Sequence, residues 1–168
     1  NLLLKNFELT LRPHPEHYKR SKSTFNRINK LFSNNENFFL DKNISNLSSL
    51  EKAEILITDN SSIVFEFLLV FKRPIIYLDY KEKIHNIDLD KLSIEIIDDK
   101  FKSDFGNKLD VKNLENLNEL CENLINKNNI SDQLVDRFEK NYFSNLNNSA
   151  SFAASYLTNK LKVFKNEK

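Results

Sequence analysis

Two serines and the turn that carries them could bind an anion. Ser61 and Ser62 lie in ILITDNSSIVFEF (55–67), after an expected strand (54–58) and at the start of an expected helix, about 62–71. The first N–H groups of such a helix have no partner inside the helix and attract anions. Serine hydroxyls there can add charge-assisted hydrogen bonds. The pattern therefore predicts a phosphate site built without a glycine-rich loop.

A single carboxylate interrupts the apolar run of the same expected helix. Glu66 lies four positions after Ser62, which places both on one helix face, about 6 Å apart. Its carboxylate could accept hydrogen bonds from the ribose of a nucleotide whose phosphate sits at the helix start. We expect Glu66 to be buried, and a buried carboxylate needs a partner. The alternative to a ligand is a structural ion pair with Lys72, Arg73 or Arg12.

Helix capping is the simplest alternative for the polar turn. Asp59, Asn60 and Ser61 all have side chains suited to an N-cap. Capping would explain one such residue but not the whole run through Ser62. We therefore include Asn60 with Ser61 and Ser62 among the expected phosphate-binding residues.

A histidine between two prolines ends the first expected strand, in the sequence LRPHP (11–15). The prolines restrict Arg12 and His14 to extended conformations, so a stiff backbone orients both side chains. An imidazole there suits proton transfer or a phosphate contact, and Arg12 adds positive charge. The alternative is a helix-start turn with an incidental histidine. His14 and His17 have no third ligand in reach, so no metal site is expected.

The elements around these residues alternate between strand and helix. Ligands of open α/β sheets bind at the carboxyl ends of the strands, where RPHP and TDNSS fall. The alternation predicts a parallel Rossmann-like sheet with helices on both faces, in a single domain over 1–168. Strands are expected at 7–12, 36–41, 54–58, 74–79 and 92–97, and helices at 15–32, 44–52, 62–71, 110–127, 131–143 and 149–165.

Composition excludes several other classes of protein. A net charge of +1 argues against general nucleic-acid binding. The one cysteine, Cys121, cannot form an internal disulfide and falls on an apolar stripe, so we expect it in the core. No segment reaches the roughly 18 consecutive apolar residues of a membrane span. Gly106 is the only glycine, which excludes glycine-rich phosphate loops.

Together, RPHP and ITDNSSIVFEF followed by KRPIIYLD resemble the carboxyl-terminal half of the CDP-glycerol glycerophosphotransferases, the teichoic acid polymerase family. The same motifs are similar to those of bacterial capsule transferases that use CMP-sialic acid or CMP-Kdo. The resemblance implies one half of a two-domain GT-B fold. The chain would then be a fragment of a longer enzyme, lacking an N-terminal acceptor domain.

The resemblance also implies roles for individual residues. His14 would lie at the catalytic site, Ser61 and Ser62 would bind the donor phosphates, and Glu66 would bind the ribose. We add Arg12 as a phosphate contact because of its charge and position. The implied partners are a cytidine-nucleotide donor and a cell-surface glycopolymer acceptor, with no cofactor. Such an enzyme would be cytoplasmic, and attachment to the inner face of the membrane is left open.

Other readings remain open from the sequence alone. A capsule glycosyltransferase using a CMP-sugar would share the fold and the phosphate site. The UDP-sugar 2-epimerases have a similar loop, but it contains glycines that this chain lacks. A non-catalytic interaction domain would use Glu66 in an ion pair and the serines as caps. The last helix has apolar and lysine side chains, and we favour its packing onto the domain over membrane contact.

Overall fold

The computed structural model describes residues 2–43, 47–59, 61–79, 91, 97–127 and 130–166. The chain forms two compact units, Asn1–Ile130 and Ser131–Lys168. The larger unit contains the predicted site residues and every strand in the described part of the chain. A single domain over the whole chain stays a prediction.

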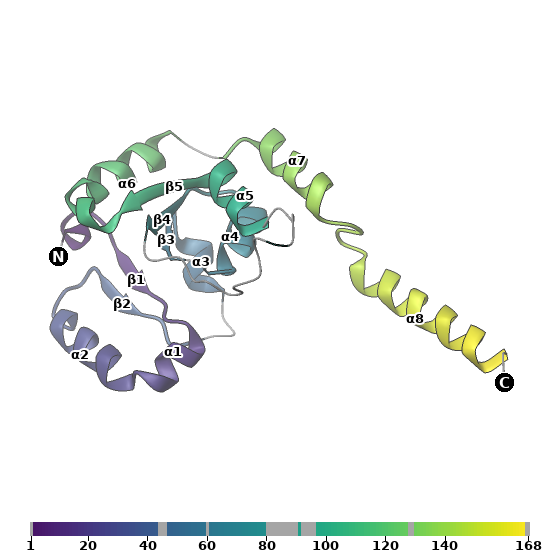
Figure 1. Cartoon of the computed structure of the whole chain (residues 1–168). Helices are drawn as coiled ribbons and strands as arrows, with labels where there is room; N and C mark the ends of the chain where they lie inside the picture. The colour runs from purple at the N-terminus through teal and green to yellow at the C-terminus, as the bar shows by residue number, and fades with distance from the viewer. Residues whose placement is uncertain are drawn as a thin grey trace. The chain divides into compact units, whose positions relative to one another are not determined.

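The described strands of the N-terminal unit all pair in parallel. β1 (Leu9–Leu11) pairs with β2 (Phe38–Leu40), and a second sheet has the order β3 (Leu56–Thr58), β4 (Ile75–Asp79), β5 (Gly106–Asp110). Helices alternate with these strands (Figure 1). The predicted α/β class with parallel strands is confirmed, and the arrangement is compatible with the Rossmann-like half of a GT-B fold.

Helices connect the strands close to the predicted places. One difference is that the helix predicted over 15–32 is divided at Ser21, whose φ of −126° and ψ of 37° are not helical. The helices of the N-terminal unit are α1 (Pro15–Arg20), α2 (Lys22–Phe32), α3 (Ser48–Lys52), α4 (Ile63–Phe71), α5 (Ile97–Phe105) and α6 (Leu117–Asn126), with 3-10 turns at Leu3–Lys5 and Val111–Asn116.

The central strand of the three-stranded sheet is buried on both faces. Ile75, Ile76 and Tyr77 are all buried, although successive residues of a strand point to opposite faces. Continuous burial of this kind is typical of a parallel sheet that is covered on both sides. Phe67 and Leu68 of α4 are fully buried as well. The helix that follows the serine pair is therefore anchored in the core.

A second group of buried side chains contains the cysteine. Cys121 packs in one cluster with Ile76, Leu109 and Leu117, so its predicted core role is confirmed. Burial raises the pKa of the Cys121 thiol. The side chain therefore stays a neutral thiol at physiological pH and contributes as an apolar group.

The strand predicted at 92–97 cannot be compared with the structure in full. Residues 92–96 lie outside the described residues, and Ile97 begins α5. β5, by contrast, was not predicted from the sequence. Of its side chains only Leu109 is buried, so it lacks the alternating apolar pattern that identifies a strand.

The only glycine of the chain has a steric reason. Gly106 begins β5 opposite Ile75 of β4. A Cβ atom at this position would collide with the Tyr77 ring and would lie 2.7 Å from the Lys102 carbonyl oxygen. The close approach of β4 and the end of α5 therefore requires glycine.

The C-terminal unit consists of α7 (Asp132–Tyr142) and α8 (Ser149–Asn166). Val135 and Phe138 of α7 are buried, whereas the α8 side chains that the structure describes, up to Val163, are all exposed. Packing of this last helix onto the rest of the chain stays a prediction. None of the described helices combines the length and the apolar character needed to cross a membrane.

Candidate functional site

The β3–α4 turn has two serine hydroxyls that the fold does not use. Ser61 is half-buried, and Ser62 is exposed at the N-cap of α4. Ser62 makes no capping hydrogen bond with its side chain. Among the residues that the structure describes, neither hydroxyl has a hydrogen-bond partner. Capping therefore does not account for this pair of serines, and both hydroxyls can bind a ligand.

Main-chain donors lie beside the two hydroxyls. The amides of Val64 and Phe65 donate to the carbonyl oxygens of Ser61 and Ser62 at 3.4 and 3.1 Å. The amides that precede them, those of Ser62 and Ile63, make no hydrogen bond to another described residue. They are the unpaired donors expected at the start of a helix. Asn60, also predicted to bind phosphate, lies outside the described residues.

The prediction that Glu66 is buried was wrong. Glu66 is exposed, whereas Val64, Phe67 and Leu68 form the buried side of α4. Water solvates an exposed carboxylate, so the energetic need for a protein partner disappears. In the described part of the chain, Glu66 makes no hydrogen bond or ion pair.

Two of the cations considered as structural partners of Glu66 bind elsewhere. Arg73 Nη1 donates to the carbonyl oxygens of Glu51 and Ala53 at 2.6 and 2.7 Å. Arg12 pairs with a different carboxylate, described next. Among the described residues, Glu66 therefore forms no ion pair with Arg12 or Arg73, the structural alternative considered from the sequence.

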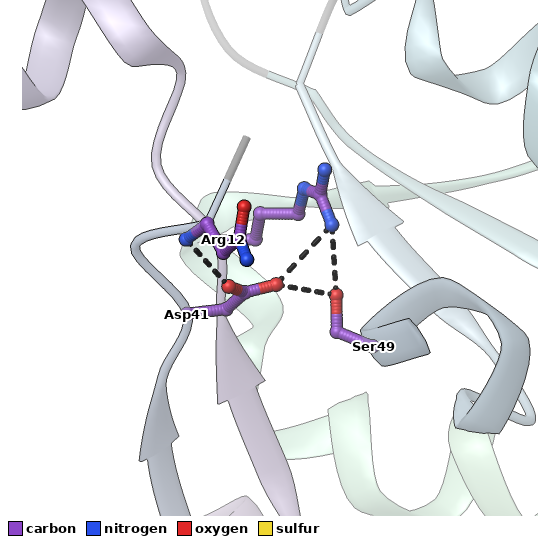
Figure 2. A network of polar contacts seen from close by, with 4 residues as sticks. Arg12, Asp41 and Ser49 are labelled. Atoms are coloured by element: carbon purple, nitrogen blue, oxygen red, sulfur yellow. Dashed lines mark hydrogen bonds and ion pairs between the residues drawn. The ribbon is translucent and has the colours of Figure 1, made fainter. Parts of the chain in front are cut away.

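A polar cluster lies where β1 and β2 end (Figure 2). β1 and β2 end in register, with Leu11 opposite Leu40, so the residues that follow them meet. Arg12 Nη1 donates to Asp41 Oδ2 at 3.2 Å and to Ser49 Oγ at 2.9 Å. The Ser49 hydroxyl donates to the same Asp41 oxygen at 2.6 Å. Since Ser49 lies in the first turn of α3, this Arg12–Asp41–Ser49 cluster joins β1, β2 and α3.

The carboxylate of the cluster is held in its charged form. Burial alone would raise the pKa of Asp41, but the Ser49 hydroxyl, the Asn43 amide and the charge of Arg12 outweigh burial and lower it. The Asn43 amide donates to Oδ1 at 2.8 Å. Asp41 is therefore ionised at neutral pH, and Arg12 faces a compensating negative charge.

His14 is exposed and caps the helix that follows it. Its Nδ1 accepts a hydrogen bond from the Glu16 amide at 3.3 Å, at the N-cap of α1. In a neutral imidazole, an accepting Nδ1 leaves the proton on Nε2; this tautomer is assigned from the hydrogen bond. Nδ1 of His14 therefore caps α1, and its Nε2–H can donate a hydrogen bond to a ligand.

The other histidine of this segment has no such arrangement. The ring of His17 packs edge-on against Phe25, with 5.3 Å between ring centroids. No group of three or more His, Cys, Asp or Glu side chains suitable for a metal occurs in the described part of the chain.

The predicted site residues fall into two segments. Arg12 and His14 follow β1, and Ser61, Ser62 and Glu66 follow β3. Ser61, Ser62 and Glu66 make no hydrogen bond or ion pair to Arg12 or His14. Both follow the carboxyl end of a parallel strand, which is where Rossmann-like sheets bind ligands.

The sequence did not predict two polar residues that bind Arg12, after β1. Asp41 directly follows β2, the strand that pairs with β1, and its place after FFL matches that of Arg12 after LTL. Correct pairing of the two strands would have identified it. Ser49 had no comparable signal in the sequence.

The arrangement can bind a phosphorylated ligand through hydroxyl, amide, imidazole and guanidinium donors. The model of the family described as CDP-Glycerol:Poly(glycerophosphate) glycerophosphotransferase matches residues 1–152. No curated protein and no solved structure matches the chain. Since the matched residues make up most of the sequence and include both segments, the chain belongs to the CDP-Glycerol:Poly(glycerophosphate) glycerophosphotransferase family, a family of transferases.

Proposed function

We propose that this chain is the donor-binding domain of a transferase that takes glycerophosphate from a cytidine nucleotide, CDP-glycerol or a close analogue. The group passes to a hydroxyl of a cell-surface polymer. The observation that carries the proposal is the family match over residues 1–152, whose description names CDP-glycerol and poly(glycerophosphate). The serine hydroxyls of the β3–α4 turn, which have no hydrogen-bond partner among the described residues, support it.

The donor phosphates bind at the start of α4. The hydroxyls of Ser61 and Ser62 each donate a charge-assisted hydrogen bond, which contributes about 1.5–3 kcal/mol. The dipole of α4 adds about 0.3–1 kcal/mol for an anion at this end. Asn60 completes the set of phosphate contacts. Because the serine hydroxyls have no bonds to other described residues, binding breaks no such bond.

The ribose of the donor binds at Glu66. This carboxylate lies one helical turn after Ser62, on the exposed side of α4. It accepts hydrogen bonds from the two ribose hydroxyls while the phosphates occupy the helix start. Its exposure supports this role, because a ligand can reach the carboxylate without displacing a protein partner.

Arg12 and His14 act on the phosphate under attack. The acceptor hydroxyl oxygen attacks the β-phosphorus of CDP-glycerol and forms a new P–O bond. The bond from that phosphorus to the oxygen bridging the two phosphates breaks, and CMP leaves with the bridging oxygen. The hydroxyl proton of the acceptor passes to the surrounding water. His14 Nε2–H and the Arg12 guanidinium stabilise the developing charge, and positioning supplies most of the rate.

The acceptor polymer binds to a second, N-terminal domain of the same enzyme, as in other two-domain GT-B transferases. In this proposal the chain alone binds the donor and turns it over slowly or not at all. The reaction runs on the cytoplasmic side of the membrane, and peripheral attachment would bring the enzyme to its polymer.

Calorimetry with different nucleotides tests the proposed donor. The purified chain is titrated with CMP, CDP-glycerol, CMP-sialic acid and UDP. We expect CMP and CDP-glycerol to bind and UDP to bind at least tenfold more weakly. Tighter binding of CMP-sialic acid than of CDP-glycerol would instead favour a CMP-sugar transferase of capsule synthesis. Absence of binding to all four would contradict a donor-binding role and favour an interaction domain.

A further inference from the structure

The Arg12–Asp41–Ser49 cluster closes a small ring of hydrogen bonds at the carboxyl end of β1. The hydroxyl of Ser49 accepts from Arg12 and donates to Asp41, so both of its functions are used. Both lone-pair regions of the carboxylate are also engaged, because Oδ1 accepts from the Asn43 amide and Oδ2 from Arg12 and Ser49. The Arg12 and Asp41 side chains are only 20% and 16% exposed.

This cluster fixes the backbone that leads to His14. Arg12 is the last residue before Pro13, whose ring locks φ near −65°. Pro15 then begins α1, and His14 between them caps that helix through Nδ1. The chain from Arg12 to Pro15 therefore has few free torsions. Whatever holds Arg12 also determines where the His14 ring lies.

We propose that Asp41 and Ser49 are positioning residues of the candidate site. By holding the Arg12 guanidinium they set the place of the β1–α1 turn and of His14 Nε2. Neither residue needs to touch the donor, and both act through Arg12. The consequence for donor binding rests on the proposed function, whereas the effect on His14 does not.

Two substitutions with matched controls separate positioning from plain structural support. Asp41→Asn removes the charge, and Ser49→Ala removes the bridging hydroxyl, while Ser49→Thr retains it. Asp104→Asn is the control, because Asp104 also forms a half-buried ion pair, with Lys100 Nζ at 2.8 Å within α5. Each variant is made in the 168-residue chain and compared with the wild-type chain.

The first readout is the NMR signal of the His14 ring in the ligand-free chain, identified by its loss in His14→Asn. We expect Asp41→Asn and Ser49→Ala to move this signal, and Ser49→Thr and Asp104→Asn to leave it in place. An unchanged His14 signal in Asp41→Asn and Ser49→Ala would overturn the proposal. If Asp41→Asn does not fold, the comparison of Ser49→Ala with Ser49→Thr tests the proposal by itself.

The second readout is the calorimetric affinity for CDP-glycerol. We expect about a tenfold loss in Asp41→Asn and a smaller loss in Ser49→Ala, as for one displaced charge-assisted hydrogen bond. Wild-type affinity in both variants would contradict an effect on the donor site. If the wild-type chain does not bind CDP-glycerol, the proposed function fails, and the NMR signal still decides whether Asp41 and Ser49 position His14.

Discussion

The two segments of the candidate site differ in how far the fold already uses their polar groups. After β3, the hydroxyls of Ser61 and Ser62 have no partner among the described residues, and Glu66 is exposed. After β1, Arg12 is held in a half-buried cluster and His14 caps α1. The segment after β3 is open to a ligand, whereas the segment after β1 is organised before any ligand arrives.

This difference suits the two parts of the proposed reaction. Groups that hold the donor by its phosphates and ribose need only be accessible when the donor arrives. Groups that act on the phosphate under attack must already be in place, because preorganised charge costs no reorganisation at the moment of reaction. Substitutions after β3 should therefore change mainly the affinity for the donor, whereas those after β1 should change the stability and the rate as well as the affinity.

The largest effect is expected for His14 in the complete transferase. His14→Asn retains a side chain that caps helices well but removes the Nε2–H donor. We expect turnover to fall by about 10²–10³-fold, as for the loss of one donor that stabilises developing charge, with α1 and the fold preserved. His14→Gln places an amide N–H near the former Nε2 and should lose less turnover, although it caps poorly. The rate of CMP release from CDP-glycerol measures the turnover of both variants. Wild-type turnover in His14→Asn would contradict a catalytic role for Nε2–H.

Asp41→Asn is expected to have the next largest effect, on stability. It removes the negative charge that faces the half-buried Arg12 guanidinium. We expect the free energy of unfolding to fall by about 1.5–3 kcal/mol, the contribution of a hydrogen bond to a charged group. Urea unfolding measures this change. A loss below about 0.5 kcal/mol, typical of a surface substitution, would mean that the segment after β1 is no more organised than the segment after β3.

Acid should remove the same contribution gradually. The cluster lowers the folded-state pKa of Asp41 below its ordinary value, which is about 3.9 in an unfolded chain. The stabilisation is complete above that value and is lost as the pH falls through the lowered pKa. The difference in unfolding free energy between wild type and Asp41→Asn should therefore shrink as the pH falls below about 5 and on through the lowered pKa. A difference that stays constant over this range would show that Asp41 ionisation does not stabilise the fold.

Substitutions in the segment after β3 should change stability least. Ser61→Ala, Ser62→Ala and Glu66→Ala remove side-chain groups that bond to no other described residue. We expect each variant to unfold within about 0.5 kcal/mol of the wild-type free energy, again by urea titration. A loss above about 1 kcal/mol in a serine variant would indicate a capping bond and would remove the contrast between the segments.

Much of the fold follows from local sequence patterns. The apolar runs EILIT and PIIYLD predict β3 and β4, because a strand covered on both faces needs apolar residues throughout. The positions of RPHP and TDNSS after strands follow from the same reasoning. β5 could not be found this way, since it depends on pairing with β4 and buries only Leu109.

The errors at the site come from tertiary structure. Glu66 was expected to be buried because the residues around it are apolar, but the core takes Val64, Phe67 and Leu68 and leaves Glu66 on the outer side. The local sequence does not specify which side of α4 faces the sheet. Likewise, the link from Arg12 to Asp41 spans 29 residues and depends on strand register, which the hydrophobic pattern of either strand alone does not determine.

The affinity of the wild-type chain for CDP-glycerol, measured by calorimetry beside Glu66→Ala, tests the central claim most directly. Glu119→Ala is the matched control, because Glu119 is also an exposed glutamate in the first turn of a helix, α6. We expect CDP-glycerol to bind the wild-type chain and Glu119→Ala equally, and Glu66→Ala about tenfold or more weakly. Equal affinity in all three, or no binding to the wild-type chain, would contradict a donor site on α4.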